Sequence, residues 1–384
     1  MRPMMKPALR RAWRDRHTVQ FGVTPAHAVL MGPVDTATGS FLELLDGTRG
    51  LPLLREEARA MGLPDGLVET LVRRLTEAGV LDDPGAGGPG ADALRSRTEE
   101  VERLRPDLAS LSVLHPEPGA APRRLAARRS ARVQVRGAGR VGAAVAAVLA
   151  ASGVGRVDVL DGGCATAGDV APGGLPDHSV GECRDLAARQ LVRRSAPGRP
   201  PRTAGSPGSA GSAEGEPPLS LVIVTPRDGL AAYAPDPVTA EPWLSTGTPH
   251  LYAGVIEATG LVGPLVLPGG TACAGCLARI RADHDPGWPR MLAQWRSGRG
   301  AGAVPACDLA LATTVAGLTA AHALSFLDGE LPASTGARWE AALPLLDWHP
   351  ERIAPHQDCP CGAAGRRRGE RVSGTGASHD TMAG

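Results

Sequence analysis

The spacing of apolar residues in the first part of the chain predicts short strands followed by amphipathic helices. Leu67, Leu71 and Leu75 recur every four residues, so a helix over this stretch has one apolar face. Two strands followed by three helices are similar in order to a winged-helix-like module, and we expect such an α+β domain over residues 1–83. The predicted elements are strands at 17–22 and 27–31 and helices at 36–45, 51–61 and 64–78.

From residue 131 onward, strand-like and helix-like segments alternate, which is typical of a doubly wound α/β sheet. Residues 131–194 read as strand, helix, strand, helix, and the continuous apolar run at 219–225 suits a buried parallel strand. We therefore expect a Rossmann-like domain over residues 131–362. The later predicted elements are strands within 251–267 joined by a turn at Gly263-Pro264, a helix at 308–327 and a strand at 338–346.

Three segments lack the pattern of a packed domain. Residues 84–130 are rich in Gly, Pro and Arg and are interpreted as a linker or connection, with room for one helix. Residues 195–218 consist mostly of Ser, Gly, Pro and Ala and predict a disordered insertion. Residues 363–384 predict a disordered tail.

Composition and charge exclude several classes of protein. With 42% hydrophobic residues, the chain of 384 residues can build cores. The net charge of +1 gives no general reason to bind nucleic acid. No uninterrupted apolar run reaches roughly 18 residues, and the basic start lacks the apolar part of a signal peptide. We expect a cytoplasmic protein with neither nucleic acid nor membrane as a partner.

A glycine-rich loop follows the first strand of the second domain. Gly137, Gly139 and Gly142 form a GxGxxG pattern that opens a helix, and Asp161 ends the next strand. In dinucleotide-binding folds these glycines allow a tight turn, close approach of a phosphate and helix–strand packing, and the acid binds ribose. The alternative is that the glycines serve packing alone and that Asp161 merely caps a strand.

Four of the seven cysteines form two close pairs. Cys273 and Cys276 make a CxxC knuckle, and Cys359 and Cys361 make a tighter pair. Thiolate pairs far apart in sequence suit a tetrahedral structural zinc site. The alternatives are a redox CxxC, reduced thiols without a metal, or His356 in place of one sulfur.

The glycine loop, the strand ending in Asp161 and the two cysteine pairs together resemble the ThiF/MoeB family, the bacterial relatives of ubiquitin-activating enzymes. The resemblance covers roughly residues 130–362. It implies a nucleotide loop at the three glycines, a ribose acid at Asp161 and a zinc knuckle made by the four cysteines. Active members of this family bind ATP with Mg²⁺ and adenylate the C-terminal carboxylate of a small protein or peptide.

Other positions depart from the family pattern. Gly163 stands where a second acid is usual, and residues 169–175 lack the Arg that contacts phosphates. Arg184 replaces a Lys and keeps its charge, so it stays a candidate cofactor-binding residue. Arg227 stands where an acid binds Mg²⁺, with Asp228 one residue late. These departures argue against ATP and Mg²⁺ chemistry, and no catalytic residue is assigned.

Kept architecture with altered chemistry is similar to one subgroup, the ThiF-like proteins of ribosomal-peptide clusters that act beside a YcaO-type cyclodehydratase. The segments that carry this resemblance are residues 1–83, in place of a leader-peptide-binding module, and residues 355–362. It implies a precursor leader peptide and the cyclodehydratase as partners, and it leaves room for a homodimer.

Three functions follow as hypotheses. The first is a scaffold that binds a leader peptide and presents it to the cyclodehydratase. The second is an ATP-dependent adenylyltransferase acting on a peptide or a sulfur carrier. The third, an NAD-dependent oxidoreductase, depends on Asp161 and the glycines alone. For residues 1–83, DNA binding or another role remains an alternative to peptide binding.

Overall fold

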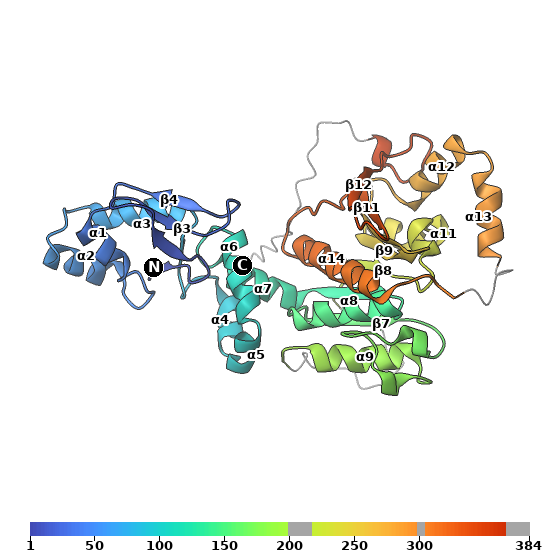
Figure 1. The fold of residues 1–384 in the computed structure, drawn as a ribbon, viewed down its shortest axis with the longest axis horizontal. Helices are drawn as coiled ribbons and strands as arrows, with labels where there is room; N and C mark the ends of the chain where they lie inside the picture. The colour runs from blue at the N-terminus through green and yellow to red at the C-terminus, as the bar shows by residue number, and fades with distance from the viewer. Residues whose placement is uncertain (199–216, 298–303, 366–384) are drawn as a thin grey trace, which may run out of the picture. The chain divides into compact units, whose positions relative to one another are not determined.

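The computed structural model describes residues 1–198, 217–297 and 304–365. It divides into two compact units, Met1–Ala127 and Arg128–Gly384 (Figure 1). Most of the predicted insertion at 195–218 and most of the predicted tail at 363–384 lie outside the described residues. At the start of that tail, Ala363–Gly365 form a short 3-10 helix, η3, in which Ala363 is buried.

The first unit begins with the α+β arrangement that the sequence predicts. A three-stranded antiparallel sheet has the order β2-β3-β4, and a second pair joins β1 to β5. Its core contains Phe21, Phe41, Leu54 and Leu75. The elements are β1 (Met4–Met5), β2 (Arg11–Trp13), β3 (Val19–Phe21), β4 (Val29–Met31), α1 (Thr36–Leu42), α2 (Leu51–Ala60), α3 (Leu67–Glu77) and β5 (Leu81–Asp82). Strand β2 is absent from the sequence prediction because all three of its residues are exposed and carry no apolar period.

Residues 84–130, interpreted above as a connection, contain four helices. They are α4 (Pro89–Arg95), α5 (Thr98–Arg103), α6 (Arg105–Leu114) and α7 (Ala120–Ser130). A small cluster of their own holds them together, with Leu94, Leu104, Leu111 and Leu125 buried. Each helix is short and buries few apolar side chains, so no periodicity stands out from its arginines and prolines.

Lys6, the single lysine of the chain, ties the first strand to these helices. It is 2% exposed, and its Nζ donates to the carbonyl oxygens of Ser112 at 2.5 Å, His115 at 3.3 Å and Pro116 at 3.2 Å. These carbonyls lie at the end of α6, where helical partners run out. Burial lowers the pKa of Lys6. The lysine is therefore a structural cap and is not available to a ligand.

The second unit is built on a seven-stranded mixed sheet in the order β12-β11-β10-β9-β8-β6-β7 (Figure 1). Strands β7, β6, β8 and β9 are parallel, and β10 to β12 are added antiparallel. The strands are β6 (Arg132–Arg136), β7 (Arg156–Leu160), β8 (Leu221–Val224), β9 (His250–Ile256), β10 (Thr259–Val266), β11 (Ala337–Ala342) and β12 (His349–Arg352). The predicted α/β fold is confirmed.

Helices cover both faces of this sheet. Alternate residues of a strand point to opposite faces, so Leu221 and Ile223 of β8 pack with α8 and α14, whereas Val222 packs against Trp243 and Ala274 on the other side. The remaining elements are α8 (Arg140–Ala151), η1 (Ala167–Asp169), η2 (Asp177–Ser179), α9 (Arg184–Ser195), α10 (Leu230–Tyr233), α11 (Pro237–Ser245), α12 (Ala274–His284), α13 (Trp288–Arg296) and α14 (Leu309–Leu327).

The turn between β9 and β10 lies elsewhere than predicted. Glu257 and Ala258 make it, both with positive φ. Gly263-Pro264 instead lies inside β10, where the pairing with β9 shifts in register. A Gly-Pro pair suits a turn and a bulge alike, and here the pairing of the flanking strands selects the bulge.

Among the described residues, α14 is the one helix long and apolar enough to cross a membrane. Its residues Leu311, Ala312, Val315 and Ala316 are buried in the main core beside the sheet. Length and composition alone do not distinguish a membrane span from a core helix of this kind, and the burial favours a core helix.

The strand order places three loops at one edge of the sheet. Strand β6 lies between β7 and β8, so the chain leaves β6 toward one side and returns on the other. The carboxyl ends of these three parallel strands lead into Gly137, Asp161 and Thr225. In open α/β sheets, ligands bind in the crevice at such a reversal point.

Candidate functional site

Close backbone packing requires two of the three loop glycines. Gly137 has φ +113°, and a Cβ there would lie 2.0 Å from the carbonyl oxygen of Thr225. A Cβ on Gly142 would lie 1.9 Å from the carbonyl oxygen of Gly137. At Gly139 the nearest atom is a side-chain atom, Cγ of Arg227, at 3.0 Å. The loop geometry therefore explains Gly137 and Gly142 without any ligand.

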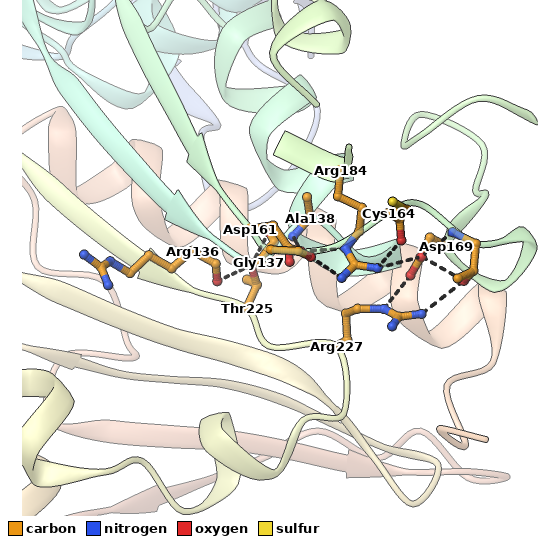
Figure 2. A network of polar contacts seen from close by, with 11 residues as sticks. Arg136, Gly137, Ala138, Asp161, Cys164, Asp169, Arg184, Thr225 and Arg227 are labelled. Atoms are coloured by element: carbon orange, nitrogen blue, oxygen red, sulfur yellow. Dashed lines mark hydrogen bonds and ion pairs between the residues drawn. The ribbon is translucent and has the colours of Figure 1, made fainter. Parts of the chain in front are cut away.

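Asp161 and Arg184, both predicted as cofactor-binding residues, lie together beside this loop (Figure 2). Asp161 Oδ2 accepts the N–H of Ala138 at 2.6 Å and lies 3.2 Å from Nε of Arg184. The guanidinium of Arg184 also donates to the carbonyl oxygens of Cys164, at 2.6 Å, and Gly162. Arg184 is buried, so its guanidinium group bonds to the backbone and does not face open space.

Asp169 joins this pair to the next strand (Figure 2). Its Oδ1 accepts from Nε of Arg227 at 2.7 Å, and its Oδ2 accepts from the N–H and hydroxyl of Thr166 at 2.8 and 2.9 Å. Nη1 of Arg184 lies 3.4 Å from the same Oδ2. Burial by itself would raise the pKa of Asp169, but the hydrogen bonds from Thr166 and the charge of Arg227 outweigh it, so the pKa is lowered.

Arg227 lies over the mouth of the glycine loop. Besides its contact with Asp169, its Nη2 donates to the Thr166 hydroxyl at 3.1 Å. Asp228, the neighbouring candidate for a metal, is exposed and accepts the N–H of Leu230 at 3.1 Å. Among the residues described around the loop, the two arginines thus neutralise the carboxylates of Asp161 and Asp169.

Open space remains beside this network. A cavity of about 150 Å³ touches Gly139, Asp169 and Arg227. A more open hollow of about 790 Å³ is lined by residues that include Gly137, Asp161, Arg227 and Asp228. Arg227 lines both spaces.

Sequence reasoning missed Asp169 and Thr166 as members of the site. The segment was read only for the Arg that it lacks. One local signal was present: Thr166-Ala-Gly-Asp169 has the spacing of a capping box, and the structure has both of its hydrogen bonds. A capping box predicts a helical turn, but it does not show that the acid also reaches two arginines.

The four cysteines of the two pairs come together as predicted. Cys273 caps α12, and Cys359 and Cys361 arrive from the segment after β12. The Sγ atoms are 3.9 Å apart for 273 and 276, 3.6 Å for 273 and 359, and 3.5 Å for 276 and 361, and all lie within 4.8 Å of one another. Four sulfurs placed tetrahedrally about 2.3 Å from one ion are about 3.8 Å apart, so this cluster has the size of a metal site.

His356 is not part of this cluster. Its Nε2 lies 2.8 Å from Oδ2 of Asp283, and its Nδ1 accepts the N–H of Asp358 at 3.1 Å. A hydrogen bond from the Cys273 thiol lowers the pKa of Cys276, and the same bond, with burial, raises the pKa of Cys273.

The sheet of the first unit has two open edges, β2 and β4. Val19 lies on the central strand β3, so its backbone is not at an edge where a peptide strand could be added. Strand β2 faces α1: Arg11 pairs with Glu43, and a Cβ on Gly39 would touch the ring of Trp13. The β4 edge carries Leu30, which is 54% exposed.

Backbone pairing shows which groups the β4 edge offers. The N–H of Arg14 donates to Thr18 and that of Gly22 to Arg10, so the even-numbered residues of β3 bond to β2. Residues of an antiparallel strand alternate in direction, so Val19 and Phe21 bond to Met31 and Val29 of β4. Leu30 lies between Val29 and Met31 in β4, so its N–H and carbonyl point away from β3.

Comparison with known proteins identifies a family and similar solved structures. The model of the ThiF family matches residues 118–361. E. coli MccB solved with ATP matches with a TM-score of 0.66 at 15% identity, over 94% of this chain and 99% of that one. The microcin C7 biosynthetic enzyme MccB in complex with N-formylated MccA matches with a TM-score of 0.65 at 15% identity, over 94% and 100%.

PaaA, solved as a selenomethionine protein, matches with a TM-score of 0.63 at 16% identity, over 91% of this chain and 100% of that one. No curated protein sequence matches. At these identities the solved structures establish a shared fold.

Replacing Asp169 by asparagine should lower the free energy of unfolding by about 2–3 kcal/mol at neutral pH, since two arginines lose the charge they face. The pKa of Asp169 is lowered in the folded chain, so this stabilisation is complete above the ordinary aspartate value of 3.8 and is lost as the pH falls through the lowered one. Denaturant unfolding from about pH 3 to pH 7 should show that the difference in free energy of unfolding between the wild type and Asp169→Asn becomes smaller at acid pH.

The matched control is Asp228→Asn, because Asp228 is exposed and the asparagine oxygen can still accept from Leu230. If Asp169→Asn were as stable as the control at neutral pH, the network would not hold this loop.

Proposed function

This chain belongs to the ThiF family, and we propose that it is a zinc-containing binding protein that holds the leader of a ribosomally made precursor peptide and presents it to a separate, YcaO-type cyclodehydratase. One observation carries the proposal: Arg227 is bonded to Asp169 and packs against Gly139, at the place where the family resemblance implies a metal-binding acid and nucleotide phosphates. The chain keeps the fold of the family, but two acids beside its glycine loop, Asp161 and Asp169, are already paired with arginines.

The glycine loop supports binding without turnover. Magnesium in phosphoryl chemistry needs carboxylate oxygens that are free to coordinate it. Asp161 and Asp169 are each paired with an arginine, and Asp161 also takes the Ala138 N–H that would otherwise face a phosphate. A nucleotide would have to break these contacts before it gained its own.

The first unit supports peptide binding. MccB, which shares the fold, has been solved with the peptide MccA. In this chain the outward N–H and carbonyl of Leu30 are free to pair with an added strand, the binding mode in which backbone bonds give affinity and side-chain pockets give specificity. Arg74 of α3 reaches Gly32 at the end of β4, with Nη2 3.5 Å from its carbonyl oxygen, so this helix flanks the edge.

Charge favours an acidic peptide. Arg10, Arg14 and Arg16 lie beside β2 and are exposed, and such charges steer an oppositely charged partner toward this sheet. The cyclodehydratase partner follows from the subgroup that residues 1–83 and 355–362 resemble, and a protein without its own chemistry needs such an enzyme.

An adenylyltransferase is the second candidate. It is favoured by the hollow of about 790 Å³ beside the loop and by the solved complex of MccB with ATP. In that case Arg227 would have to swing away from Asp169 when nucleotide enters.

A nucleotide experiment separates the two. The wild-type chain should show no magnesium-dependent ATP–pyrophosphate exchange, with or without the precursor peptide, because Arg227 replaces the metal acid. Robust exchange that Asp161→Ala abolishes would establish the adenylyltransferase instead.

Zinc should hold the four cysteines. A structural zinc site contributes on the order of 10 kcal/mol of binding free energy, so losing one ligand should lower metal content and Tm together. Cys361→Ser should show both losses by atomic emission and thermal unfolding. Cys307→Ser, a thiol outside the cluster, should show neither. A metal-free wild-type protein that unfolds at the same temperature as the zinc-loaded one would refute the zinc site.

Proline at Leu30 tests the peptide edge. It removes the outward N–H but leaves the bonds from β4 to β3 intact, which edge strands tolerate. The Kd for the proposed precursor peptide should rise about tenfold, because one backbone hydrogen bond is lost. Leu30→Val keeps the N–H and should bind normally, and Arg11→Pro tests the opposite edge in the same way.

Fluorescence anisotropy of labelled peptide and of duplex DNA, across a salt titration, gives the readout. Peptide binding should depend weakly on salt, whereas DNA binding would fall by orders of magnitude. DNA binding that falls steeply with salt, together with no binding of the peptide, would refute peptide binding by this unit. If only Arg11→Pro weakened peptide binding, the peptide would pair with β2 instead of β4.

A further inference from the structure

Two exposed cysteines outside the metal cluster, Cys164 and Cys183, lie directly opposite each other on neighbouring backbone segments. They form an isolated antiparallel bridge. The N–H of Arg184 donates to the carbonyl of Gly163 at 3.0 Å, and that of Ala165 donates to the carbonyl of Glu182 at 2.8 Å. These two bonds flank the cysteine pair on either side, which is the pattern of a non-hydrogen-bonded antiparallel pair.

This kind of pair suits a disulfide. Its Cα atoms are about 4.5 Å apart and its side chains share one face of the ladder. Disulfides join Cα atoms about 4.4–6.8 Å apart, so a bond needs only side-chain rotation. Both thiols are free and exposed. Cys307, in contrast, is half-buried and is not paired with another cysteine in the backbone bridges of the described residues.

We propose that Cys164 and Cys183 are a reversible redox pair, oxidised to an intrachain disulfide by a low-molecular-weight disulfide of the glutathione class. One cysteine thiolate attacks a sulfur of the small disulfide, forms a mixed disulfide and releases one small thiolate. The second cysteine thiolate attacks the protein-side sulfur of that mixed disulfide and releases the other. The chain loses two protons and two electrons, and the oxidant becomes two thiols.

The bond would close the segment that presents Asp169 to the glycine loop. This segment runs from Cys164 to Cys183, and Asp169 within it meets Arg227, which follows β8, and Arg184 of α9. The carbonyl of Cys164 itself accepts from Arg184 at 2.6 Å. Oxidation would therefore tie together the two ends of the segment in which Asp169 lies, and Asp169 holds Arg227 beside the glycine loop. This role does not depend on the function proposed above.

The test uses the full zinc-loaded chain treated with oxidised glutathione, then alkylated and analysed by mass spectrometry. The wild type should lose the mass of two hydrogens and yield one peptide cross-linked between Cys164 and Cys183, reversed by reduced glutathione. Cys164→Ser and Cys183→Ser should each keep a single glutathione adduct, because the resolving thiol is missing. Cys307→Ser should behave as the wild type.

Oxidation should also raise the Tm of the wild type and of Cys307→Ser, with no such shift in the other two variants, since closing a loop restricts the unfolded chain. Stable adducts on both Cys164 and Cys183 without a cross-link would overturn the proposal. A cross-link that leaves Tm unchanged would overturn the closing of the segment.

Discussion

A single buried carboxylate, that of Asp169, holds together the segments that meet at the reversal point of the sheet. Both of its oxygens are taken, one by Arg227 and the other by Thr166 and Arg184. Burying this carboxylate without a partner would cost free energy, so the ion pairs with the two arginines stabilise the fold around it. The side chain of Arg227 therefore stays over the glycine loop, where a family member with ATP chemistry would need space for phosphates and a metal.

The same constraint links three segments that are far apart in sequence. Asp169 belongs to the loop after β7, Arg184 begins α9 and Arg227 follows β8. Removing one member would leave an uncompensated charge on the others, so the network responds as a unit. Such coupling fits a rigid scaffold better than a site that must open and close around a nucleotide in each turnover.

Sequence reasoning succeeded where the chemistry is local and failed where it depends on the fold. The GxGxxG loop and the two cysteine pairs are each set within a few residues, and the structure brings them to the expected places. Asp169 could not be assigned, because nothing near it in sequence shows that Arg227 folds back onto it. The helices of residues 84–130 were missed because their burial comes from one another, and strand β2 because its three residues are exposed. Gly263-Pro264 suited both a turn and a bulge, and only strand pairing decided between them.

The glycine loop shows that packing alone can require two of the three glycines of a GxGxxG motif. Gly137 and Gly142 are required by backbone atoms within about 2 Å of where a Cβ would lie, and this requirement holds whether or not a phosphate is present. Gly139 meets only the flexible side chain of Arg227, so this is the position where binding, as distinct from packing, would demand a glycine. A GxGxxG pattern therefore reports a strand, a tight turn and a closely packed helix. Whether a nucleotide occupies it depends on the charges that face the loop, and in this chain two of them, on Asp161 and Asp169, are already paired with arginines.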